Sequence, residues 1–376
     1  MCVKRLPKSD RVRVLINGVH AKSGGGVIHL RNILPLLAAD ERLEVHLFLH
    51  ADQIGLFHPV DERVRVHLFT FRNGFFRLLL WEQTALPVLA RVMNADVVFS
   101  LANFGPLLAP NHVLLLSNTF AVARSEWRLS KRLYWLALYL VTFLSVVTCR
   151  RSIAVSRYAL DTLAPRWYRR QGGKTVVIHH GVSPLFVPDA VVPRERFLLA
   201  VSDIYVQKNL HNLVRALATL RERHPDIRLL VAGSCIDQTY YRHLVELVTH
   251  LGLTDAVTFV GRLPPEELRP LYQRCLVFVF PSTAEAFGLP LIEAMACGAP
   301  VACSNATAMP EVVGDAADQF DPGDPVAMAA VLDHLIESED RRAELSRAAL
   351  RRASEFSWQR AARETADVLC QAAGGK

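Results

Sequence analysis

Short apolar runs alternate with amphipathic segments along most of this chain. "CLVFVF" (275–280) is a continuous apolar run rich in β-branched and aromatic residues, which is typical of a strand buried on both faces. Comparable runs lie at 11–17, 43–49, 64–69, 96–99, 113–116, 152–155, 175–178, 196–202, 226–233, 257–263 and 300–304. Segments with apolar residues at helical spacing separate several of them, for example 27–38, 208–220 and 264–275. This alternation predicts parallel sheets with helices on both faces.

The clearest local unit follows the strand at 275–280. Gly288 permits a backbone conformation that other residues resist, and Pro290 suits the first turn of a helix. We expect that helix over 291–297, with Gly298 at its C-terminal cap and the next strand at 300–304. The loop before the helix should lie at the carboxyl edge of the sheet, where the helix N-terminus favours an anionic ligand.

Two carboxylates bracket this turn. Glu285 precedes the helix and Glu293 lies near the end of its first turn, so both can face the same crevice. Carboxylates hold phosphate poorly but accept hydrogen bonds from hydroxyls, which indicates a guest that is anionic and polyhydroxylated, such as a sugar nucleotide. The alternative for an isolated pair at this spacing is two solvated surface glutamates.

The surrounding residues decide between these interpretations. "EAFGLPLIEAMACGAPV" (285–301) closely resembles the signature of the retaining glycosyltransferases of family four (group 1), which have the GT-B fold. The resemblance implies an α/β protein of two Rossmann-like domains with a cleft between them. It places an acceptor-binding domain at 1–182, a nucleotide-sugar-binding domain at 183–356, and a helix at 357–376 that crosses back to the first domain.

The resemblance also implies roles for single residues. Lys208, in the "KN" position, would stabilise the leaving nucleoside diphosphate, while Glu285 binds donor-sugar hydroxyls and Glu293 the ribose hydroxyls. Backbone N–H groups of Phe287, Gly288 and Leu289 would contact the donor, the backbone near Gly261 and Arg262 would recognise the base, and Gly24, Gly25 and Gly26 would face donor phosphate and acceptor. Many relatives have an arginine five residues before the lysine, where this chain has Asp203.

The acceptor side of the first domain is less well marked. A catalytic histidine or aspartate often follows the family's strand equivalent to 113–116, where this chain offers Asn118. Asn118 and Asn103 are the candidates for contacting an acceptor. In "WEQ" we expect Trp81 to be a packed aromatic and Glu82 a surface charge. His179 and His180, near the interdomain connection, are expected to be structural.

Charge is distributed unevenly. Residues 1–185 hold 24 Lys and Arg against 11 Asp and Glu, whereas residues 186–376 hold 19 against 25. A basic first half suits an anionic partner such as a lipid surface or a phosphorylated acceptor. Nucleic acid is the rival partner, but no nucleic-acid-reading motif supports it. The uncharged stretch 133–148 is short of the roughly 20 residues that span a bilayer. We expect a buried helix there, with a helix in the membrane surface as the alternative.

The remaining composition narrows the chemistry. Seven scattered cysteines form no zinc or disulfide pattern, which fits a reducing, cytoplasmic setting, and no signal peptide is recognised. The chain has no D-x-D motif, so we expect no metal and no cofactor beyond the nucleotide-sugar co-substrate. The resemblance implies a hexosyltransferase, with mannose favoured, that acts on a glycan or lipid-linked acceptor. A non-catalytic sugar-nucleotide binder and a sugar-nucleotide epimerase stay open as alternatives.

Overall fold

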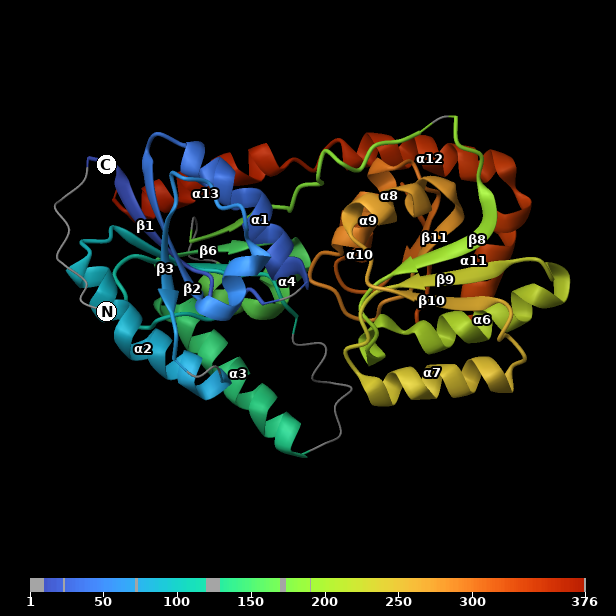
Figure 1. Cartoon of the computed structure of the whole chain (residues 1–376), viewed down its shortest axis with the longest axis horizontal. Coiled ribbons are helices and arrows are strands. Elements are labelled where there is room, and N and C mark those ends of the chain that lie inside the picture. Colours follow the sequence, from blue (N-terminus) through green and yellow to red (C-terminus); the bar gives the residue numbers. More distant parts are fainter. Residues whose placement is uncertain are drawn as a thin grey trace. The chain divides into compact units, whose positions relative to one another are not determined.

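The computed structural model describes residues 10–22, 24–71, 74–119, 129–169, 174–189 and 191–374. The chain divides into two compact units, each with its own parallel sheet (Figure 1). Unit 1 comprises residues 1–181 and 358–376, and unit 2 comprises residues 182–357. The expected α/β class with two Rossmann-like sheets is confirmed.

The sheet of unit 1 has seven parallel strands in the order β3-β2-β1-β4-β5-β6-β7. They are β1 (Val12–Asn17), β2 (Leu43–His50), β3 (Arg65–Phe69), β4 (Val97–Ser100), β5 (His112–Leu116), β6 (Arg151–Ala154) and β7 (Thr175–Val177). The central strands β1, β4 and β5 are buried at every position, as the apolar runs predict. From β1 the chain goes on to β2 on one side, while β4 lies on its other side, so the strand order reverses between β1 and β4.

Helices cover the sheet of unit 1. They are α1 (Gly24–Ala39), η1 (Ala51–Leu56), α2 (Phe75–Val92), α3 (Leu129–Thr148), α4 (Arg157–Leu163), α5 (Arg166–Arg169) and α13 (Trp358–Ala372). Helix α13 comes last in the chain but packs on α1 and on the strands β1, β4, β5 and β6. The ring of Trp358 packs at the start of α13. Its centroid lies 5.7 Å from that of the His29 ring and 5.5 Å from that of the His180 ring. His180 is buried, in keeping with a structural role.

The sheet of unit 2 has six parallel strands in the order β10-β9-β8-β11-β12-β13. They are β8 (Glu195–Val201), β9 (Arg228–Ala232), β10 (Val257–Gly261), β11 (Cys275–Phe280), β12 (Val301–Ser304) and β13 (Asp318–Phe320). β11 occupies the range that its apolar run predicts and is buried throughout. β13 is a three-residue edge strand that no apolar run predicts. The order reverses between β8 and β11.

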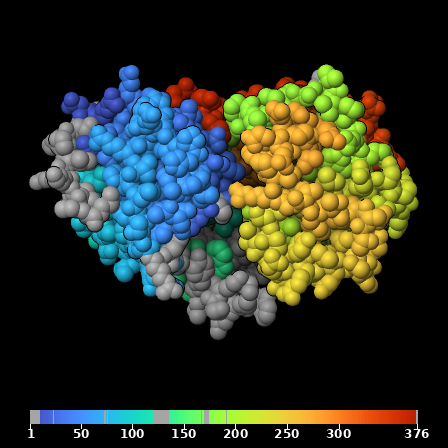
Figure 2. Space-filling model, viewed as in Figure 1, coloured from blue at the N-terminus to red at the C-terminus, as the bar shows by residue number. Residues whose placement is uncertain are grey.

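The helices of unit 2 are η3 (Val206–Lys208), α6 (Leu210–Arg223), α7 (Gln238–His250), α8 (Pro265–Arg274), α9 (Leu289–Ala296), α10 (Met309–Val313), α11 (Pro325–Glu337) and α12 (Glu339–Ala353). Asp237 and Asp324 cap α7 and α11 by accepting hydrogen bonds from backbone N–H groups of the first turn. In the space-filling view, the yellow-to-orange part of the chain that includes α7 and α8 forms most of the visible face of this unit (Figure 2).

The uncharged segment 133–148 departs from the expectation of a buried helix. It belongs to the longer helix α3, and none of the described helices is long and apolar enough to cross a bilayer. One face of α3 packs inward through residues such as Ser145 and Val146. The opposite face leaves Leu136, Tyr139, Leu140 and Leu144 about half exposed, at the i, i+3, i+4, i+8 spacing of one helical stripe.

Candidate functional site

The carboxyl edge of the second sheet brings together the residues singled out around Glu285. The loop after β8 carries Lys208 and the loop after β11 carries Glu285, and these two strands are neighbours at the point where strand order reverses. Open parallel sheets bind their ligands in the crevice at such a point, because the two loops leave in opposite directions. The geometry therefore supports a ligand site at the predicted place.

An ion pair joins the two loops. The Lys208 ammonium nitrogen lies 2.5 Å from Glu285 Oε1, with 12% and 15% of the two side chains exposed. The ammonium also lies over the rings of Tyr205 and Phe280, at 5.3 and 5.7 Å from their centroids. Because an ammonium carries three N–H donors, the bond to Glu285 leaves donors for a second anionic partner.

The electrostatics of Lys208 keep it charged. Burial by itself lowers the pKa of the ammonium, but the charge of Glu285, together with Tyr205, outweighs burial and leaves the pKa of Lys208 above its ordinary value. Burial in turn raises the pKa of Tyr205. The site thus holds a fixed, partly desolvated cation, which is the kind of group that stabilises a departing diphosphate.

Hydrogen bonds from neighbouring residues hold the two loops together. Asn209, in a left-handed conformation (φ 56°), donates hydrogen bonds from its side chain to the carbonyls of Pro281 (3.0 Å) and Pro322 (2.7 Å). The Thr283 N–H donates to the Gln207 carbonyl at 2.9 Å. The Glu285 N–H donates to the Thr307 hydroxyl at 3.1 Å. Sequence reasoning missed the role of Asn209, although asparagine is among the few residues that readily adopt this conformation.

The start of α9 has the backbone that the motif predicts. Gly288 is left-handed (φ 97°), and α9 begins at Leu289. Phe287 and Leu289 are buried, and Phe287 packs edge-to-face on Phe356. Their side chains therefore belong to the core, so any ligand contact from this stretch has to come from backbone N–H groups.

Glu293 is paired with a residue of α8. It accepts a hydrogen bond from the Tyr272 hydroxyl at 3.0 Å. Burial raises the pKa of the Glu293 carboxyl to about 7, although the Tyr272 hydrogen bond acts in the opposite direction. A carboxyl with this pKa changes charge near neutral pH, and its ability to accept hydrogen bonds from hydroxyls changes with it. Nothing in the sequence pattern pointed to Tyr272.

The remaining candidates of unit 2 lie on neighbouring loops. Gly261 ends β10 with φ 76°, and both Gly261 and the following Arg262 are exposed. Asp203 accepts a hydrogen bond from the Ser234 N–H at 3.1 Å. The residue that departs from the family pattern thus ties the loop after β8 to the loop after β9.

Unit 1 corrects two expectations. The helical pattern at 27–38 left Gly24, Gly25 and Gly26 outside the helix, but they form the first turn of α1, with Gly24 left-handed at φ 56°. Asn103 is buried, and its side-chain oxygen accepts from the N–H groups of Ser117 (2.9 Å) and Asn118 (3.1 Å). Asn103 therefore clamps the loop after β5, and its oxygen is occupied. Asn118 is exposed.

Glu82 is the clearest misprediction. It is completely buried and not a surface charge, whereas Trp81 packs against Phe48, Phe69 and Phe71, as a packed aromatic should. Asn17 donates a hydrogen bond to one oxygen of Glu82. Its burial depends on a residue 65 positions away, which the local sequence does not reveal.

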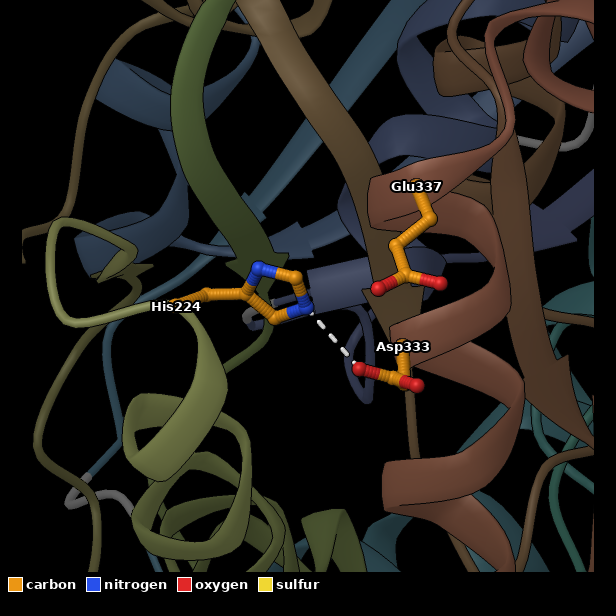
Figure 3. Close-up of side chains that lie close together, drawn as sticks. All are labelled: His224, Asp333 and Glu337. Carbon is orange, nitrogen blue, oxygen red and sulfur yellow. Dashed lines mark hydrogen bonds and ion pairs between the residues drawn. The ribbon is translucent and has the colours of Figure 1, made fainter.

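One group of side chains has metal-ligand chemistry. His224, Asp333 and Glu337 approach one another between the end of α6 and α11 (Figure 3). His224 Nε2 lies 2.9 Å from Asp333 Oδ1. Arg223 forms ion pairs with both carboxylates, with the Glu337 pair at 2.5 Å. Arg223 thus places a positive charge beside both carboxylates, and the cluster connects the end of α6 to α11.

Comparison with known proteins identifies the region that carries this site. Residues 187–352 match the family described as "Glycosyl transferases group 1". The chain is 35% identical over 175 residues to the O-antigen chain mannosyltransferase B of Escherichia coli, covering 45% of this chain and 44% of that protein. It is 38% identical over 168 residues to a D-inositol 3-phosphate glycosyltransferase of Salinispora tropica, covering 43% and 35%. The chain thus spans less than half the length of these curated relatives.

Solved structures match nearly the whole chain. A sucrose-phosphate synthase of Thermosynechococcus elongatus superposes with a TM-score of 0.76 and 22% identity, over 97% of this chain and 100% of that one. Anabaena HepE in complex with UDP and glucose superposes with a TM-score of 0.76 and 20% identity, over 96% and 100%. At this identity the likeness establishes the fold.

Proposed function

Because residues 187–352 belong to the group 1 glycosyltransferases and the chain has the GT-B fold, we propose that the protein is a retaining hexosyltransferase. It takes a hexose from a nucleoside-diphosphate sugar and passes it to a glycan or lipid-linked acceptor in cell-surface polysaccharide synthesis. Mannose is the favoured sugar, since relatives of the matched region include an O-antigen chain mannosyltransferase and a serotype-specific mannosyltransferase, both of Escherichia coli. UDP and glucose in the HepE structure support a sugar nucleotide as donor.

The observation that carries the proposal is the Lys208–Glu285 ion pair at the point where strand order reverses. The remaining donors of the Lys208 ammonium bind the diphosphate and stabilise its developing charge as the glycosidic bond breaks. Glu285 accepts hydrogen bonds from the donor sugar, and the N-terminus of α9 adds its dipole. Lys208 thus supplies the charge for which other enzymes use a metal, and we propose that transfer needs no metal.

Retention follows from a front-face displacement in this proposal. The acceptor oxygen attacks on the side from which the diphosphate leaves, and the leaving oxygen takes the acceptor proton. A double displacement would need a nucleophile on the opposite face of the sugar. We assign no residue to that role, and the protein contributes through positioning and through the charge of Lys208.

The test is a thermal-shift panel of nucleoside diphosphates with EDTA present throughout. We expect one diphosphate to raise the unfolding midpoint of the wild type, because a ligand that binds only the folded state stabilises it. Lys208→Ala and Glu293→Ala should lose that shift, and Glu246→Ala, an exposed site in the same unit, should keep it. A shift that survives in Lys208→Ala would place the donor elsewhere, and no shift in the wild type would favour the non-catalytic alternative.

We further propose that the protein is cytoplasmic and contacts the inner face of a membrane through unit 1. The exposed apolar stripe of α3 has a counterpart on α2, where Phe76, Leu80 and Val88 are exposed. The two helices are neighbours, since Gln83 of α2 and Ser145 of α3 both hydrogen-bond to the backbone of Gly105. An apolar surface in a basic region suits an anionic lipid surface, where a lipid-linked acceptor would be found.

A further inference from the structure

A buried carboxylate lies at the carboxyl edge of the first sheet, outside the site described above. Glu82 of α2 is 0% exposed. Asn17, the last residue of β1, donates a side-chain hydrogen bond to Glu82 Oε1. Among the described residues, Oε2 has no hydrogen-bond partner, although the Nε2 atom of His20 lies 3.5 Å from it. Burying a carboxylate is costly, so the complete burial of Glu82 calls for a role.

His20 is the side chain that the Oε2 atom of Glu82 faces. His20 follows β1, and its ring packs edge-to-face on Phe104, which follows β4, at 4.9 Å between centroids. β1 and β4 are neighbouring strands at the point in unit 1 where the strand order reverses. Open parallel sheets bind ligands at such a point, and His20, on the loop that follows β1, has 16% of its side chain exposed.

The chemistry of the pair follows from the two ring nitrogens. A carboxylate facing Nε2 favours the tautomer that carries its proton on Nε2, which leaves Nδ1 with a lone pair. Nδ1 is then able to accept a hydrogen bond from a hydroxyl. Asn17 fixes Glu82, Glu82 orients the His20 ring, and the first turn of α1, with its three glycines, begins four residues after His20. No large side chain lies in that turn.

We propose that His20 binds a hydroxyl of the sugar or polyol acceptor, with Glu82 and Asn17 as its positioning residues. This assignment rests on the proposed glycosyl transfer and deepens it by placing an acceptor contact in unit 1. Asn103, the earlier candidate, cannot fill that place because its oxygen is already occupied by two backbone N–H groups. His20 orients the acceptor oxygen and does not need to take its proton.

The binding test uses saturation-transfer NMR with methyl α-mannoside, methyl α-glucoside and methyl α-galactoside as probes. We expect at least one probe to give a signal with the wild type and with His243→Ala, an exposed histidine in unit 2. The same signal should persist in Lys208→Ala and vanish in His20→Ala. A signal that survives in His20→Ala, or no signal with any probe in the wild type, would overturn the assignment. Diphosphate binding should persist in His20→Ala, so failure of this inference differs from failure of the donor site.

A second measurement tests the positioning role of Glu82 through the tautomer of His20. A loss of fold would not produce the same change of tautomer. Nitrogen NMR of histidine-labelled protein should show His20, assigned by its absence in His20→Ala, as the Nε2–H tautomer. Glu82→Gln keeps the shape but turns an N–H donor toward His20, so the ring should change to the Nδ1–H tautomer and probe binding should weaken. Thr84→Ala, exposed on the same helix, should leave the tautomer unchanged. An Nδ1–H tautomer in the wild type would contradict the proposed arrangement.

Discussion

Single carboxylates in this protein behave differently because their surroundings differ. Glu285 is held by the ammonium of Lys208, whereas Glu293 is buried and accepts a hydrogen bond from the hydroxyl of Tyr272. The consequence is a pKa of about 7 for Glu293. In the unfolded chain the same carboxyl titrates near 4.5, so folding draws a proton onto Glu293 between these two values.

Glu293→Gln should therefore change the pH dependence of stability. Between about pH 4.5 and 7 the folded wild type holds a proton that the unfolded chain has released, so its unfolding free energy falls as pH rises. The variant lacks this loss, and its stability relative to the wild type should rise by at most about 3 kcal/mol across that range. Urea unfolding at several pH values would measure it, with the exposed Glu246→Gln as control. A constant difference between variant and wild type would contradict the raised pKa.

Prediction of single residues from the sequence succeeded where the motif is local. The αL conformation of Gly288 and the cap at Gly298 follow from one contiguous motif. The loops that carry Lys208 and Glu285 lie together because β8 and β11 are neighbouring parallel strands that end at one edge. Glu82 and Tyr272 could not be predicted in this way. Their partners come from other elements, and only tertiary packing brings them together.

Helices and strands formed where the apolar pattern placed them, with exceptions that have physical causes. The short strand β13 reads Asp-Gln-Phe, with a single apolar residue, so it carries almost no apolar signal. Helix α3 has an apolar composition on both faces, and composition alone cannot show that one of those faces is exposed. The two sides of such a helix differ only in what packs against them.

The exposed face of α3 leads to a prediction about membranes. Replacing Leu140 and Leu144 together by serine should weaken binding to phosphatidylglycerol vesicles by about tenfold, since inserting two leucines contributes about 1.5 kcal/mol. Both side chains are half exposed, so the fold should persist. Vesicle sedimentation would measure the loss, with Val326→Ser, an exposed site on unit 2, as control. Equal sedimentation of all three proteins would refute membrane contact through α3.

The junction between β8 and β9 is a sensitive point of unit 2. A Cβ atom at Gly233 would lie 1.9 Å from the Ser202 carbonyl oxygen, which is backbone and cannot move aside freely. Gly233→Ala should therefore cost more than about 3 kcal/mol in unfolding free energy. At Gly55 a Cβ atom would meet nothing within 4 Å, so Gly55→Ala is the control. Chemical denaturation compares them, and similar stabilities would show that the loop after β8 relaxes.

The molecule as a whole consists of two compact units, and each has its own sheet. Two such units need not unfold together. Calorimetry should resolve two transitions, and a bound nucleoside diphosphate should raise only the one that belongs to unit 2. Leu30→Ala, at a fully buried position of α1, should lower the midpoint of the transition that belongs to unit 1, because it removes about 3 kcal/mol of stability. A single transition that both changes move together would show that the units unfold as one.

The path of the chain has a consequence for synthesis on the ribosome. Unit 2 is one uninterrupted stretch, whereas unit 1 is completed by α13, which is translated after all of unit 2. Domains generally fold as they emerge, the earliest first. Here the first sheet appears early but waits for its last covering helix, so the later unit can reach its native state sooner. Until α13 arrives, the apolar surface that it covers on β1, β4, β5 and β6 stays open to nascent-chain chaperones.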